Sequence, residues 1–162
     1  MPDVTLDTAV DQIRAILQEA FEGPQQPWSY FTDQGADAAL LGTLEKLSAA
    51  EASRVVGGTS VAAHVHHVAF GLSASAGWIK GDRTQRNWQE SWLISTIDDN
   101  AWPVLLDVLR NRYAELKEAI DTHALTSIEA LGGAMGAVAH VAYHLGAIRQ
   151  KIACAAELPP KS

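Results

Sequence analysis

The amino-acid sequence predicts an all-α protein, a four-helix bundle with long crossing connections between its helices. Apolar residues recur at steps of three and four along four long stretches, which is the period of an amphipathic helix. No stretch of convincing length alternates apolar and polar residues, as a strand with one solvated face does. With 162 residues, 48% of them apolar, the chain is expected to form one domain over 1–162 with a real core.

The first half of the chain holds two of the four long stretches. One runs over 6–21 and ends at Gly23-Pro24, because neither residue continues a helix readily. A short helix is expected over 40–47, and the Ser48–Glu51 segment has the pattern of a capping box that opens a further turn. The second long helix is expected from a cap at Thr59 or Ser60 to about Lys80, before Gly81-Asp82.

The second half opens with a polar connection over 82–97 that contains Trp88 and Trp92. It is long for a compact domain, and long ordered loops are often functional. A third long helix is expected after the N-cap candidates 98–100, and a fourth from a capping box over 126–129 to about residue 156. The inward positions expected on the last helix are Leu131, Met135, Val138, Val141, Leu145, Ile148 and Ile152.

Composition excludes several function classes. The formal net charge of -7 argues against nucleic-acid binding, since phosphate contacts need clustered Lys and Arg. No apolar run approaches the ~20 residues of a membrane span, and the polar, acidic N-terminus is not a signal peptide. The single Cys154 excludes an internal disulfide and suits a reducing compartment. We therefore expect a cytoplasmic protein without nucleic-acid or membrane partners, and a buried, inert thiol.

Histidines are the residues most suggestive of chemistry. His140 and His144 are four apart on the last predicted helix, so they share a face and can converge on one metal ion. A third imidazole from the second long helix would complete a three-histidine set with open coordination positions, as in catalytic metal sites. Imidazole ligands suit Zn, Ni, Fe or Cu. The alternative is that these are buried, hydrogen-bonded core histidines without a metal.

Helical periodicity leaves the third ligand open. His64 lies closer to the main apolar stripe of the second long helix, whereas His67 shares a flank with Gly71 and Trp78. His66 points away from both and is expected to be solvated. A helix that touches two neighbours can bury the wider arc, so either His64 or His67 could face the last helix.

Two motifs resemble those of the DinB/YfiT-like superfamily. The segments Gly57-Gly58-Thr59-Ser60-Val61 and His66-His67-Val68-Ala69 look like its second-helix motif. The segment His140-Val141-Ala142-Tyr143-His144-Leu145-Gly146 looks like its last-helix motif. The order and spacing of the expected helices match over nearly the whole chain. One departure is Ala147, which stands where relatives often carry glutamine directly after the glycine.

The resemblance implies a four-helix bundle of DinB/YfiT type, a homodimer, and a divalent metal held by three histidines. Carried over by motif, the ligands are His67, His140 and His144, with Zn or Ni expected first and Fe or Mn next. Known activities among relatives are mostly thiol-cofactor transferases and isomerases. The resemblance thus implies a low-molecular-weight thiol or another small molecule as the substrate.

Two functional hypotheses follow. In the first, the protein is a metal-dependent enzyme of transferase or hydrolase type, whose ion activates a water or a thiol. No Asp or Glu lies within four residues of the three ligand positions, so His64 is the local candidate for a catalytic acid or base. In the second, the protein is a noncatalytic stress-response or small-molecule-binding bundle.

Overall fold

A computed structural model describes residues 5–157 and is all-helical over that range, with 69% helix. The predicted all-α class is therefore confirmed. The helices are α1 (Leu6–Glu22), η1 (Ala36–Ala38), α2 (Leu40–Leu44), α3 (Ala49–Ala52), α4 (Val61–Ile79), η2 (Trp88–Trp92), α5 (Ala101–Thr122) and α6 (Ile128–Glu157), η1 and η2 being 3₁₀-helices.

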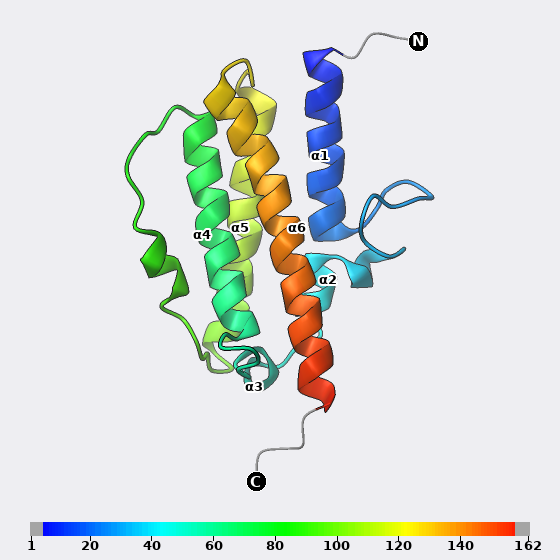
Figure 1. Cartoon of the computed structure of the whole chain (residues 1–162), viewed down its shortest axis with the longest axis vertical. Helices are drawn as coiled ribbons and strands as arrows, with labels where there is room; N and C mark the ends of the chain where they lie inside the picture. Colours follow the sequence, from blue (N-terminus) through cyan, green and yellow to red (C-terminus); the bar gives the residue numbers. More distant parts are fainter. Residues whose placement is uncertain (1–4, 158–162) are drawn as a thin grey trace.

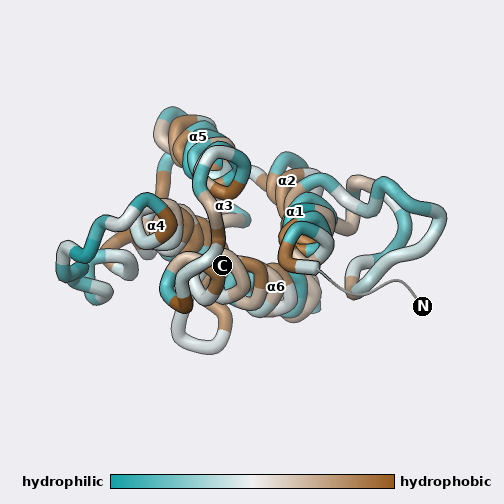
Figure 2. The backbone as a smooth tube through the Cα atoms, turned by 90° about the horizontal axis from the view of Figure 1, so that it is seen from above, coloured by the Kyte–Doolittle hydropathy of each residue, from teal (hydrophilic) through white to brown (hydrophobic). Residues whose placement is uncertain are grey.

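Four long helices, α1, α4, α5 and α6, lie side by side, with the short α2 and α3 toward one end (Figure 1). Helix α4 packs against both α5 and α6, and α1 packs mainly against α6. Viewed along the helices, the four surround a common centre (Figure 2). The largest fully buried side chains are Phe21, Leu17, Leu40, Leu44, Leu72, Leu109, Leu116, Ile120, Ile148, Val65, Val68 and Val141.

Most predicted helix starts are confirmed by their caps. The Ser48 hydroxyl accepts the Glu51 N–H while the Glu51 carboxylate accepts the Ser48 N–H, so the capping box forms as predicted. Of the two cap candidates for α4, Ser60 is the one used, because its hydroxyl accepts the Ala63 N–H. The cap of α6 differs from prediction, since Ser127, one residue later than Thr126, accepts the Ala130 N–H.

The inward face of α6 is built from smaller residues than expected. Met135 was predicted inward but is 57% exposed, whereas Gly133, Ala134 and Ala137 are buried. The prediction followed large apolar residues and overlooked the small ones. Small side chains let α6 approach α4 closely, since a Cβ atom built on Gly133 would lie 3.6–3.8 Å from atoms of Ser75, Trp78 and Ile79.

A single buried carboxylate organises the loop after α1. Glu19 is 3% exposed and accepts the backbone N–H groups of Tyr30, Phe31 and Thr32 at 2.9, 3.0 and 3.1 Å, along with the Ser29 hydroxyl at 2.7 Å. Burial alone would raise the pKa of Glu19, but these hydrogen bonds outweigh it and lower the pKa to about 2. The ionised side chain therefore holds an otherwise irregular segment against α1.

The long connection predicted over 82–97 contains the 3₁₀-helix η2, which packs against α4 (Figure 1). The hydroxyl of Ser91, a residue with no exposed surface, donates to the Trp88 carbonyl at 2.6 Å. The connection is therefore ordered at the position where α4 carries its histidines.

Within the described part of the chain, α6 is the one helix long and apolar enough to span a membrane by length and composition alone. Its most apolar window has a mean hydropathy of 1.2 and is 39% buried. Core helices meet the same criterion, and α6 packs against α4 and α1. The absence of a membrane partner stays a prediction.

Candidate metal centre

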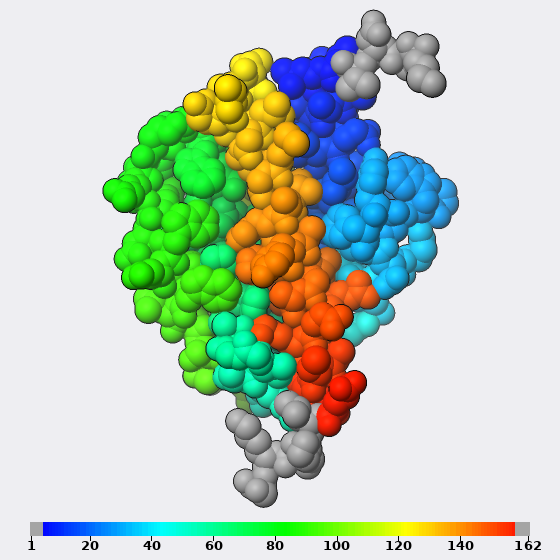
Figure 3. Space-filling model, in the orientation of Figure 1, coloured from blue at the N-terminus to red at the C-terminus, as the bar shows by residue number. Residues whose placement is uncertain are grey.

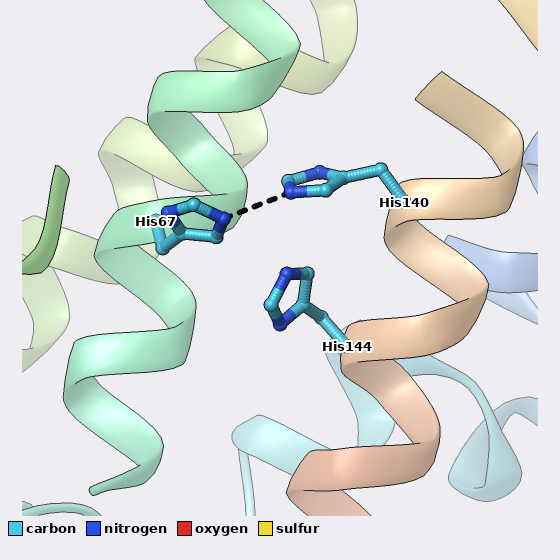
Figure 4. Close-up of side chains that lie close together, drawn as sticks. All are labelled: His67, His140 and His144. Atoms are coloured by element: carbon cyan, nitrogen blue, oxygen red, sulfur yellow. Dashed lines mark hydrogen bonds between the residues drawn. The ribbon is translucent and has the colours of Figure 1, made fainter. Parts of the chain in front are cut away.

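Three histidines from two helices meet between α4 and α6 (Figure 4). His67 comes from α4, and His140 and His144 lie one turn apart on α6. One nitrogen of each ring lies within 4.8 Å of the others, and the Nε2 atoms of His67 and His140 are 3.0 Å apart. A tetrahedral ion with metal–nitrogen bonds of about 2.0–2.1 Å needs nitrogens about 3.3 Å apart. The 3.0 Å between the His67 and His140 nitrogens is close to that spacing.

The ring of His67 is fixed by Ser91. His67 Nδ1 lies 2.6 Å from the Ser91 hydroxyl oxygen, whose own hydrogen is donated to the Trp88 carbonyl at 2.6 Å. The hydroxyl can therefore only accept from His67, which places the His67 proton on Nδ1. Nε2 then carries the lone pair, and it faces His140. This is the tautomer that a metal ligand needs.

The ring of His144 is fixed by His64. The two Nδ1 atoms are 2.8 Å apart, and His64 Nε2 lies 3.0 Å from the Thr59 hydroxyl. His64 therefore contacts His144 on the nitrogen that points away from the cluster. The other His144 nitrogen is directed toward the remaining two rings (Figure 4). The structure thus resolves the choice left open by periodicity, since His67 joins the cluster and His64 holds a member of it.

His140 occupies space that only a glycine on α4 leaves open. A Cβ atom built on Gly71 would lie 2.6 Å from Cε1 and 2.9 Å from Nδ1 of His140. Real Cβ contacts are not that short, so any side chain at 71 would displace the imidazole. Helical periodicity placed Gly71 beside His67 and gave it no role. The available signal was a glycine inside a helix, where it is normally unfavourable.

Aromatic and polar groups of η2 enclose one side of the cluster. Trp92 stacks on the His67 ring with centroids 4.0 Å apart and planes at 19°, and Trp88 lies 6.0 Å from the same ring. His66, predicted to be solvated, is half-buried, and its Nδ1 donates to the Ser91 carbonyl at 2.7 Å. This correction arises because the connection folds back over α4 and gives His66 a partner. Ser91 was not predicted as a site residue, because helical periodicity does not mark a residue in a connection.

The electrostatics of the cluster favour neutral imidazoles. Burial lowers the pKa of His67 to about 4 and that of His144 to about 3, and it also lowers the pKa of His140. Repulsion between neighbouring protonated rings adds to the effect at His67 and His144. All three rings are therefore uncharged near pH 7, the form in which imidazole binds a metal. No carboxylate belongs to the group among residues 5–157.

Two further residues of α6, Cys154 and Tyr143, are exposed to solvent. Cys154, predicted to be buried, is exposed on the last turns of α6 because the helix extends past the core there. Tyr143 is 72% exposed, and its ring lies edge-on to His144 with centroids 5.0 Å apart.

Comparison of the chain with models of protein families, with curated proteins and with solved structures finds no match. The chemical interpretation of the site therefore rests on its geometry. That geometry consists of three converging, neutral imidazoles, two of which are oriented by neighbouring side chains, in a setting suited to one divalent cation.

Proposed function

We propose that this protein binds a divalent metal ion through His67, His140 and His144 and is a metal-dependent enzyme. The observation that carries the proposal is the convergence of three ring nitrogens from α4 and α6 within 4.8 Å of one another. Three protein ligands leave at least one coordination position for water or substrate, as catalytic zinc sites do, whereas structural sites use four.

The bound ion would lower the pKa of a coordinated water or thiol and supply a nucleophile at neutral pH. The chain's own residues hold and orient the ligands. Ser91 sets the tautomer of His67, and Trp92 covers one face of that ring. Trp88 stands beside both His67 and His140 and helps to keep water from that side of the cluster.

His64 has a different role in this proposal from the acid or base predicted from sequence. Both of its ring nitrogens have partners, His144 on one side and the Thr59 hydroxyl on the other. We therefore propose that His64 positions His144 by accepting a hydrogen bond from His144 Nδ1–H and donating its own Nε2–H to the Thr59 hydroxyl. A ligand histidine commonly has such a partner on its second nitrogen.

We also propose that the chain is a homodimeric DinB/YfiT-like bundle of thiol-dependent transferase or hydrolase type, with Zn or Ni as its ion. The support is that the two resembling motifs fall on α4 and α6 and bring their histidines to one point. Imidazole nitrogen is a good ligand for either metal. A low-molecular-weight thiol is the first substrate class to test.

The test compares turnover of the purified protein as isolated, after chelation, and after reloading with Zn or Ni. The reactions are conjugation of small thiols to electrophiles and hydrolysis of activated esters. We expect one of them to fall at least tenfold on chelation and to return on reloading. Tight metal binding without metal-dependent turnover in either assay would contradict the enzyme and favour the noncatalytic binding bundle.

A further inference from the structure

A groove of 380 Å³ lies between the 56–59 turn and the outer face of α6, next to the candidate metal centre. The turn (teal) and α6 (orange to red) lie side by side on the face seen in Figure 3. His64 and Tyr143 line the groove, and each of them contacts the ring of His144. An occupant of the groove would therefore lie one side chain away from the metal ligands.

Lys151 gives this groove a positive charge. It is the one Lys or Arg of the lining, and no Asp or Glu lines the groove, although the whole chain has a net charge of -7. Within residues 5–157 its ammonium makes no ion pair. Glu51 lines a separate hollow on another side of Lys151, where its carboxylate accepts two hydrogen bonds from Ser48.

The ammonium of Lys151 is held in place by neutral groups. It donates to the backbone carbonyls of Val56 and of Thr59, the latter at 3.3 Å. Carbonyls orient the side chain without neutralising its charge, and an ammonium that is already placed loses less conformational entropy when it binds an anion. An ammonium has three donors, so one remains for a ligand beyond these two carbonyls.

Polar side chains also line the groove. The Tyr143 hydroxyl, the Gln150 amide and the Thr59 hydroxyl all belong to residues that line the groove. We propose that the groove binds a small organic anion, with its carboxylate or phosphate group on Lys151. The anion site stands without a metal. Its further role, that the anion anchors a substrate beside the metal centre, rests on the proposed function.

The direct test is a titration of the isotope-labelled, chelator-treated full chain, followed by nuclear magnetic resonance. The probes are acetate, inorganic phosphate and neutral acetamide at equal ionic strength. We expect acetate or phosphate to shift the amide signals of residues 56–59 and 147–154 saturably, and acetamide to leave them unchanged. The anion with the lower dissociation constant shows whether the groove prefers a carboxylate or a phosphate group. Signals that move equally with acetamide, or anion shifts scattered over the surface, would overturn the site.

Variants then test the charge. Lys151→Met is expected to raise the dissociation constant of the preferred anion about ten- to a hundredfold, the range for a charge-assisted hydrogen bond. Lys80→Met removes an equal charge from an exposed position outside the groove and should leave the constant unchanged. Equal effects of both variants would mean general charge attraction and would contradict the inference. If Lys151→Met unfolds, the wild-type titration still decides.

Repeating the titration on zinc-loaded protein separates this inference from the proposed function. Binding to the same residues with and without zinc supports the anion site, even if no metal-dependent turnover is found. Binding that needs zinc and shifts only signals around His67 and His140 would mean that the anion is a metal ligand, and the groove assignment would be wrong.

Discussion

At the scale of single residues, Ser91 is the residue of η2 that holds the histidines of α4 in place. Its hydroxyl accepts from His67 and its carbonyl accepts from His66, so one buried residue ties two consecutive histidines of α4 to η2. Nothing in the sequence marks it, because its role depends on a connection that folds back over a helix. Of the three histidines that meet, by contrast, His140 and His144 were predicted from helical spacing, and His67 was chosen by motif resemblance.

Replacing Ser91 tests this dependence. Ser91→Ala removes the acceptor that fixes the His67 proton on Nδ1, and we expect metal affinity to fall about 10–100-fold. Ser91→Thr keeps the hydroxyl and should retain most of the affinity. Competition with a chromophoric chelator measures both, and Ser73→Ala, a half-buried serine elsewhere on α4, is the matched control. Unchanged affinity in Ser91→Ala would contradict the positioning role.

A second prediction at the scale of single residues concerns Gly71. In Gly71→Ala the added methyl would meet the His140 ring, so metal affinity should fall at least tenfold even though alanine favours helix. The control is Gly132→Ala on α6, where the added methyl meets nothing within 4 Å. We expect it to raise the free energy of unfolding by about 0.5–1 kcal/mol without changing metal affinity. Both quantities follow from chelator competition and urea unfolding, and normal affinity in Gly71→Ala would argue against the site.

At the scale of elements, Glu19 determines how the loop after α1 is held. The folded carboxyl has a pKa of about 2 against 4.5 when exposed, so its contribution is present above pH 4.5 and is lost as the pH falls toward 2. The shift corresponds to about 3–4 kcal/mol. Helix periodicity did not predict this role, because an acidic residue on a helix is read as solvated until its loop partners are known.

We therefore expect Glu19→Gln to lower the free energy of unfolding at pH 7 by about 2–3 kcal/mol. The difference from wild type should shrink between pH 4.5 and pH 3, where the wild-type carboxylate begins to lose its advantage. Urea unfolding at several pH values measures this difference in the free energy of unfolding. A constant difference at every pH would show that the ionised form of Glu19 is not what matters.

At the scale of the whole molecule, the helical pattern predicted the order and approximate bounds of the long helices. It did so because each buries one apolar face, as the stripe from Val10 to Phe21 on α1 illustrates. It failed on Met135, where small residues form the inner face, and on Cys154, where α6 extends beyond the core. How His64 and His67 divide their roles depends on the relative rotation of α4 and α6, which a one-dimensional pattern does not contain.

The core of the molecule does not depend on the proposed ion, because apolar side chains from all four long helices form one continuous cluster. Chelation is therefore expected to leave the far-ultraviolet helical signal intact. Zinc at a hundredfold excess over its dissociation constant should stabilise the fold by about 2.7 kcal/mol and raise the melting temperature. Circular dichroism and thermal unfolding measure both effects. Loss of helix on chelation would show instead that the metal is structural.

Metal stoichiometry tests the central claim most directly. Elemental analysis of protein that has been equilibrated with zinc and desalted should give one ion per wild-type chain. It should give one for His123→Ala, an exposed histidine outside the cluster, and much less than one for His140→Ala and for His67→Ala. Equal metal content in all four proteins, or none in the wild type, would contradict a shared site at His67, His140 and His144.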